Sequence, residues 1–136
     1  MIAENLAYAL TQVVHNFGAA AVLGGAYFAL WPAFRADHTR SLAWLILAAW
    51  AAQIVSGTTF AAVSLYYYGE TPDLSAVAMG ALAIKVASAV LGVLLSAYYL
   101  YRGRHWQAAA SRRMFAVLAA LGAIALAAAA VLRWFA

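Results

Sequence analysis

Two side chains that could bind a ligand or a metal, His15 and Lys85, lie inside otherwise apolar stretches of the chain. Lys85 falls near the middle of the apolar run 74–101, which is long enough to cross a membrane because about 20 helical residues suffice at ~1.5 Å each. A charged lysine at the centre of such a helix costs at least about 2.5–3.5 kcal/mol on insertion scales. We therefore expect Lys85 to face a ligand or a partner; the alternative is a lysine whose stem extends to the lipid headgroups.

His15 has two interpretations. A neutral imidazole is the commonest metal ligand in proteins, which makes His15 a candidate ligand for haem or a metal. It could equally be an interhelical hydrogen-bonding group. No other predicted span carries a histidine, so a haem would have to use His15 alone, a methionine such as Met79, or a second chain. Copper sites usually use several Met, Cys or His ligands, and the candidates here are His15 and Met79.

Other kinds of chemistry have no support in the sequence. There is no cysteine, which excludes disulfides, CxxC redox motifs and thiolate-metal sites within the chain. No Ser-His-Asp set, paired acids, P-loop or HExxH motif is present, so hydrolysis and phosphoryl transfer are not indicated and no catalytic residue is predicted.

The composition indicates the elements that must position these residues. Hydrophobic residues make up 68% of the 136 and charged residues 9%, against about 25% charged in soluble domains, so the chain is predicted to be an integral membrane protein in a lipid bilayer. Hydropathy predicts four spans, about 6–30, 42–66, 74–100 and 114–132. We therefore predict an all-α fold, in which residues 1–136 form a single transmembrane domain, a four-helix bundle. Asp73 is expected to cap the third helix.

Polar and small residues recur at helical spacing within three of the spans. A predicted face of the first span carries Gln12, His15, Asn16 and Ala19 at three- and four-residue spacing, and Gln53 and Ser56 share a face of the second. The third span has Ser88, Gly92 and Ser96 at every fourth residue, which is typical of a helix-packing face, and Lys85 three residues earlier. The first span carries Gly18, Gly24 and Gly25, which are expected to allow close approach of another helix.

Comparing depths suggests that these polar groups converge. His15, Lys85, Gln53 and Ser56 are predicted to form one cofactor- or ligand-binding pocket in the middle or outer part of the membrane. No Asp or Glu lies within any span, so the partner of Lys85 must be non-acidic or come from outside the chain. A bound anion or another subunit would supply a counter-charge.

The charges in the loops predict the orientation. The first and third loops hold six arginines, whereas the opposite side holds one arginine and three acids: Arg35, Arg40, Arg102, Arg104, Arg112 and Arg113 against Arg133, Glu4, Glu70 and Asp73. By the positive-inside rule both termini lie on the outer, periplasmic side and the basic loops in the cytoplasm. The net charge of +4 is therefore interpreted as a topology signal, and no nucleic-acid partner is expected.

Two stretches resemble a known family. The segment from His15-Asn16-Phe17-Gly18 to Gly24-Gly25-Ala26-Tyr27-Phe28 resembles the first core helix of the CopD-type (copper-resistance protein D type) membrane domain. The helix from Lys85 to Tyr101-Arg102 resembles a later helix of that domain, and the same outline is distantly similar to HemJ-type protoporphyrinogen oxidases.

Three hypotheses remain, all for a multi-pass protein of the bacterial inner membrane, and the resemblance implies the first two. The first is a CopD-like module that handles copper or haem, with His15 as ligand and Lys85 as an anion or counter-charge site. The second is a HemJ-like enzyme that oxidises a porphyrinogen with haem b, with His15 on the iron and Lys85 on a propionate. The third, which the docking faces suggest, is an accessory subunit of a larger respiratory or redox complex. For partners we expect a homo-oligomer or another membrane subunit.

Overall fold

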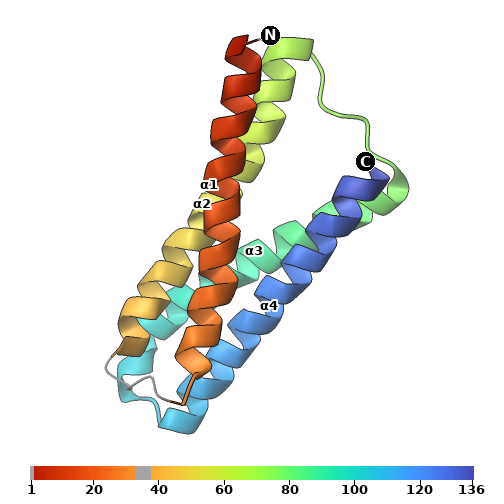
Figure 1. The fold of residues 1–136 in the computed structure, drawn as a ribbon. Coiled ribbons are helices and arrows are strands. Elements are labelled where there is room, and N and C mark those ends of the chain that lie inside the picture. Colours follow the sequence, from red (N-terminus) through yellow and green to blue (C-terminus); the bar gives the residue numbers. More distant parts are fainter. Residues whose placement is uncertain (1, 33–37) are drawn as a thin grey trace.

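Four long helices make up almost all of the computed structural model, which describes residues 2–32 and 38–136. They are α1 (Ile2–Leu30), α2 (Thr39–Tyr68), α3 (Ala76–Arg102) and α4 (Ala108–Phe135), with a short 3-10 helix, η2 (Gly103–His105), between the last two (Figure 1). The described residues contain no strand. The predicted all-α four-helix bundle is confirmed.

Each helix is long and apolar enough to cross a membrane, so the chain is a multi-pass membrane protein. The helices extend a few residues beyond the predicted spans, because helical hydrogen bonding continues into polar residues such as Arg102 and Arg112 that hydropathy excludes. The predicted cap of α3 is wrong. The hydroxyl of Ser75, not the carboxylate of Asp73, accepts from the Ala78 amide at 3.2 Å. Ser75 directly precedes the helix, whereas Asp73 comes two residues too early to reach its first turn.

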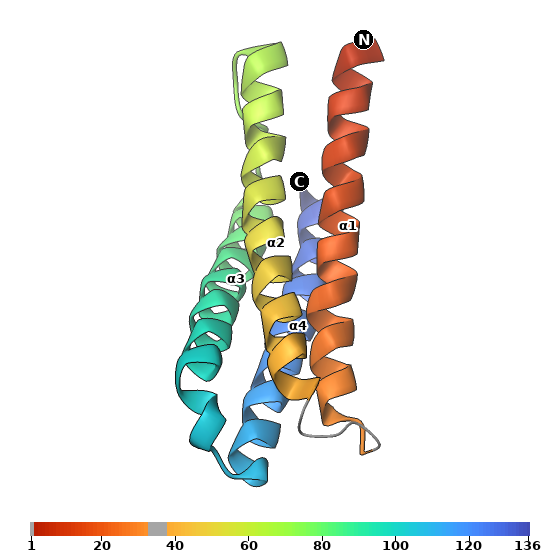
Figure 2. The ribbon, with the colours of Figure 1, turned by 90° about the vertical axis from the view of Figure 1, so that its left-hand side faces the viewer.

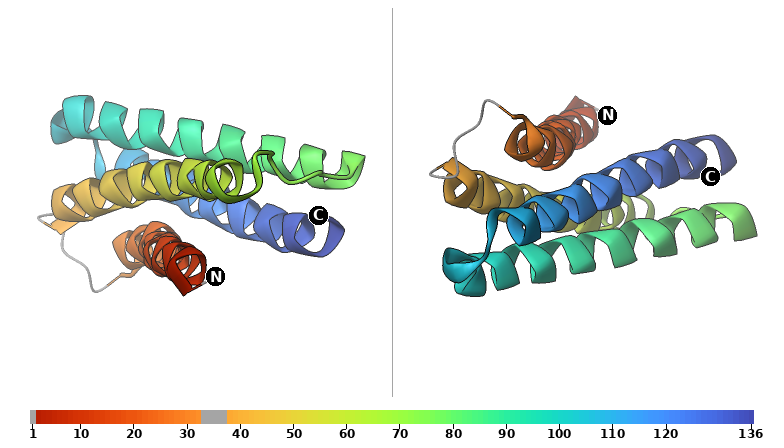
Figure 3. Two further views of the ribbon diagram at one scale, coloured as in Figure 1. Left: turned by 90° about the horizontal axis from the view of Figure 1, so that it is seen from above. Right: turned by 90° about the horizontal axis from the view of Figure 1, so that it is seen from below.

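The helices pack as two antiparallel pairs. α1 packs mainly on α2 and α3 on α4, while contacts between α1 and α4 and between α2 and α3 close the ring. Figure 1 shows the pairs converging at the end that carries the α1–α2 and α3–α4 connections and diverging toward the two termini; Figures 2 and 3 give the same arrangement from the side and along the bundle. Because α1 and α3 lie diagonally, any contact between them must cross the bundle.

Hydrogen bonds at the diverging end lie within each pair. The hydroxyl of Tyr68, at the end of α2, donates to the Glu4 carboxylate on α1. The hydroxyl of Ser75 donates to the carbonyl of Phe135 at 2.5 Å, which ties the start of α3 to the end of α4. These bonds join the two helices within each pair and do not join one pair to the other.

Glycines decide how closely the helices approach. A Cβ on Gly92 of α3 would lie 2.2 Å from the Trp50 indole of α2, and one on Gly18 of α1 would lie 2.6 Å from Gln53 Nε2. Both positions therefore require glycine for the packing seen. Gly25 also meets α2, with Ile46 Cγ1 at 3.0 Å from its ideal Cβ position. Gly24 was expected to act in the same way, but nothing lies within 4 Å of its Cβ position, because it faces away from α2.

Candidate functional site

A chain of hydrogen bonds fixes the imidazole of His15. The Ser56 hydroxyl donates its one hydrogen to the Ala52 carbonyl at 2.5 Å. The assignment that satisfies both contacts has the Ser56 oxygen accepting from His15 Nδ1, which lies 2.7 Å away. This assignment places the proton on Nδ1 and the lone pair on Nε2. Lys85 Nζ lies 2.9 Å from Nε2 and donates to it.

The packing of α1 against α2 explains this placement. Gln53 Nε2 donates to the backbone carbonyl of His15 at 2.5 Å, and the absence of a side chain on Gly18 gives the amide room to do so. Ser56 follows Gln53 by three residues and so shares its helix face. Phe60, one turn beyond Ser56, meets the imidazole edge to face with the ring centroids 5.7 Å apart. The ring is thus held by a hydrogen bond, an aromatic contact and its own anchored backbone.

Lys85 reaches this site from the diagonal helix. It is partly buried, and its hydrogen bond to His15 joins α3 to α1 across the bundle. The described acids, Glu4, Glu70 and Asp73, lie at the diverging end, and within residues 2–32 and 38–136 the structure gives Lys85 no ion pair. Its partner is therefore a neutral imidazole, a non-acidic group of the kind the sequence predicted.

The predicted metal ligand Met79 does not join this cluster. It precedes Lys85 by six residues, which places it about 9 Å further along α3 and roughly 120° around the helix. Its side chain is 54% exposed. No group of three or more His, Cys, Asp or Glu side chains that could hold a metal occurs in the described part of the chain. Of the predicted residues, the structure brings together His15, Lys85, Gln53 and Ser56.

A buried polar face continues along α3 from Lys85. Ser88, Gly92 and Ser96 are buried, which confirms the predicted packing face. Two polar atoms in this interface have no hydrogen-bond partner among the described residues: Ser96 Oγ, which is 0% exposed, and the indole Nε1 of Trp50, which is 2% exposed. The sequence predicted the close approach at Gly92 but not its partner Trp50, since an apolar span offers no signal for which tryptophan faces inward.

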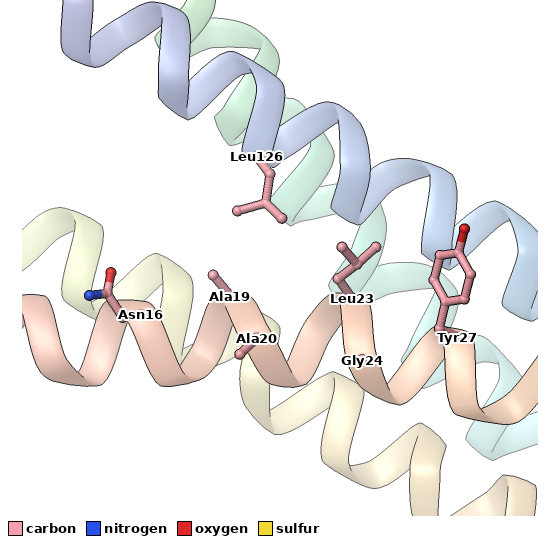
Figure 4. Close-up of a pocket in the computed structure, with 7 residues that line it drawn as sticks. All are labelled: Asn16, Ala19, Ala20, Leu23, Gly24, Tyr27 and Leu126. Atoms are coloured by element: carbon pink, nitrogen blue, oxygen red, sulfur yellow. The ribbon is translucent and has the colours of Figure 1, made fainter.

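A separate apolar groove of about 610 Å³ runs between α1 and α4. Figure 4 shows Ala19, Leu23 and Tyr27 of α1 in this groove, with Leu126 of α4 above Ala19. Asn16 lines it too and accepts a hydrogen bond from Gln12 Nε2 at 2.7 Å. Of the face predicted on the first span, Asn16 and Ala19 line this groove and Gln12 bonds to Asn16, whereas His15 bonds to α2 and α3.

Comparison of the chain with protein-family models, with curated proteins and with solved structures finds no match. The class is therefore defined by fold and site alone: a multi-pass, all-α membrane protein with a histidine–lysine pair inside a four-helix bundle.

Proposed function

We propose that this chain is a membrane module that handles haem at a site formed by His15 and Lys85. The observation that carries the proposal is the state of the imidazole. Ser56 holds the Nδ1 proton, so the Nε2 lone pair points into the bundle at a flexible amine instead of a fixed donor. A metal-binding histidine has this arrangement, with one ring nitrogen bonded to the protein and the other available.

The residues present fit haem better than copper. A haem with one axial histidine needs one nitrogen lone pair, apolar surroundings and a cation for its propionates. His15 and Lys85 supply the first and the last, and a lysine can form a charge-assisted bond to a carboxylate. Copper would find one imidazole and one amine, since Met79 lies on another part of α3. We therefore propose the CopD-like module with haem, and not copper, as the group that it handles.

Each residue would have a distinct role. Bound haem would supply one-electron redox chemistry. Ser56, by accepting from Nδ1, would fix the tautomer and orientation of His15 and increase its basicity as a ligand. Lys85, on its four-carbon stem, would leave Nε2 and pair with an anionic group of the ligand. Gln53 would hold the backbone of His15 in place.

Absorbance spectroscopy tests this proposal. The wild-type protein, titrated with haemin in detergent, should shift and sharpen the Soret band relative to free haemin, and His15→Ala should not, because no other histidine reaches the site. His105→Ala, at the loop end of the bundle, is the matched control and should shift the band as the wild type does. Absence of a shift with the wild type, or the same shift with His15→Ala, would refute haem ligation by His15.

A HemJ-like enzymatic role requires the same haem site and adds catalysis to haem binding. It adds that the haem-loaded protein oxidises a porphyrinogen to a porphyrin and passes the released electrons to an added acceptor such as a quinone, with the protons released to solvent. The reaction is followed by porphyrin fluorescence. Haem binding without fluorescence development would leave a haem-handling module and exclude this oxidase activity.

The groove between α1 and α4 supports a second proposal, self-association of this chain; a role as accessory subunit of a larger complex stays a prediction. Its wall includes Ala19, Ala20 and Gly24, and small residues allow a second membrane helix to approach closely. We propose a second copy of this chain as the occupant. Gly24→Leu fits within one copy, because its Cβ position is open, yet would fill the groove. It should shift the mass in solution toward the monomer, whereas Gly80→Leu, equally open, should not.

We further propose that the converging end faces the cytoplasm of a bacterial inner membrane and both termini face the periplasm. Support comes from the charge distribution: Arg40, Arg102, Arg104, Arg112 and Arg113 lie at the converging end, and the described acids at the other. Arg35 and Asp37, which the sequence places in the first loop, lie outside the described residues.

A further inference from the structure

A polar pocket of about 420 Å³ lies at the converging end of the bundle, away from the His15 site. Three arginines from three different elements line it: Arg40 of α2, Arg104 of η2 and Arg112 of α4. The hydroxyl residues Thr39 and Ser111 lie in the same wall. Segments far apart in the sequence thus bring three positive charges to one cavity.

The described chain supplies no negative charge to balance them. No acid lines the pocket, and Glu4, Glu70 and Asp73 belong to the opposite end of the bundle. Asp37 lies outside the described residues. Like charges at close range repel one another unless an anion lies between them. The cluster therefore calls for a ligand with negative charge.

One of the three arginines is held in place by the fold. Arg40 Nη1 donates to the Leu100 carbonyl near the end of α3 at 2.9 Å, which fixes the guanidinium against the bundle. Arg104 and Arg112 are exposed side chains at the mouth. A guanidinium presents a planar set of five donors that matches the oxygens of a phosphate group.

Two helices also begin at the pocket. α2 starts at Thr39 and α4 at Ala108, both of which line it, and the N-cap residue of α4, Gln107, makes no side-chain cap. Helix N-termini carry partial positive charge and unpaired amide hydrogens. They add to the field of the arginines and favour the same kind of ligand.

We propose that this pocket binds a phosphate group, carried either by an anionic phospholipid headgroup or by a free phosphate compound. Basic pockets between membrane helices are typical headgroup sites, and the indoles of Trp31 and Trp106 in the lining suit the membrane interface. The ligand contacts α2, η2 and α4, so it joins the two helix pairs where they converge. This inference is independent of haem binding.

Thermal unfolding of the wild-type protein in a neutral detergent distinguishes the two sources. One arm adds phosphatidylglycerol, with phosphatidylcholine as the uncharged-net control, and another adds inorganic phosphate or glycerol 3-phosphate without lipid. A rise in Tm with phosphatidylglycerol alone identifies a lipid headgroup, because a ligand that binds the folded state stabilises it. A rise with the water-soluble phosphates as well identifies a free phosphate compound. No rise in either arm overturns the proposal.

Variants locate the effect. Arg104→Gln combined with Arg112→Gln should weaken the apparent affinity about tenfold or more, the loss expected for removing charged hydrogen bonds. Arg113→Gln combined with Arg133→Gln is the matched control, because both residues lie outside the lining and the change in net charge is the same. Equal affinity of the two double variants would overturn the assignment. If the first variant does not fold, Arg112→Gln alone makes the same comparison with Arg113→Gln.

Discussion

Replacing Lys85 with methionine tests how the ammonium affects the stability of the fold and whether it takes part in ligand binding at the His15 site. The substitution keeps the shape of the stem and removes the ammonium, together with its 2.9 Å bond to His15 Nε2. Removing a charge from the centre of a span gains about 2.5–3.5 kcal/mol on insertion scales. Losing one interhelical hydrogen bond in a membrane costs about 0.6–2 kcal/mol. Lys85→Met should therefore stabilise the fold by roughly 0.5–3 kcal/mol.

The free energy of unfolding in mixed micelles measures this difference. Lys85→Arg is the control that keeps the charge; it should be less stable than the wild type, because a planar fork does not fit the place of a compact ammonium beside Nε2. A double-mutant cycle with His15→Ala isolates the pair, and a coupling of about 0.6–2 kcal/mol is expected. A loss of stability in Lys85→Met would refute the reasoning, since it would mean that burying the ammonium costs less than its bond to His15 contributes.

The same variant separates a structural from a functional lysine. If Lys85 pairs with an anionic group of haem, Lys85→Met should stay folded and bind haemin more weakly, while His15→Ala should not bind it. Unchanged haemin affinity in a folded, equally or more stable Lys85→Met would leave Lys85 without a role in the ligand site.

Three further predictions follow from the packing and the charges. Gly92→Ala should destabilise the protein by about 1–3 kcal/mol in the same unfolding assay, because its Cβ would lie 2.2 Å from the Trp50 indole, whereas Gly80→Ala on the same helix has open space and should not. Ser96→Ala should be neutral or stabilising, because the buried hydroxyl has no partner to lose; a loss above about 1 kcal/mol would contradict this. In this cysteine-free chain, Thr71→Cys should react with an impermeant thiol reagent only from outside the cell, and Gln107→Cys only from the cytoplasmic side. Labelling of Thr71→Cys only from the cytoplasm would show that the orientation is the reverse of the proposed one.

The meeting of His15, Gln53, Ser56 and Lys85 could be predicted because depth in a membrane bundle follows from position within a span. Rotation about the helix axis does not follow in the same way. Gly18 lets Gln53 approach the backbone of α1, and this contact sets the angle at which His15 faces Ser56. The sequence could therefore predict a shared site but not that Lys85 would bond to the imidazole itself. Met79, six residues before Lys85, lies both at another depth and on another face of α3.

The arginines show a second limit. A positive-inside count gives each arginine of a loop the same weight, so Arg112 and Arg113 are equivalent for topology. In the folded chain they differ, because adjacent helical residues point about 100° apart, and Arg112 lines the polar pocket while Arg113 does not. Arg40 has a second role beside its charge, because its side chain donates a hydrogen bond to the Leu100 carbonyl. Orientation depends on how many basic residues a loop carries, but the pocket depends on which of them face the converging helix ends. The two properties can therefore be changed separately, by exchanging which residue in the Arg112–Arg113 pair is charged.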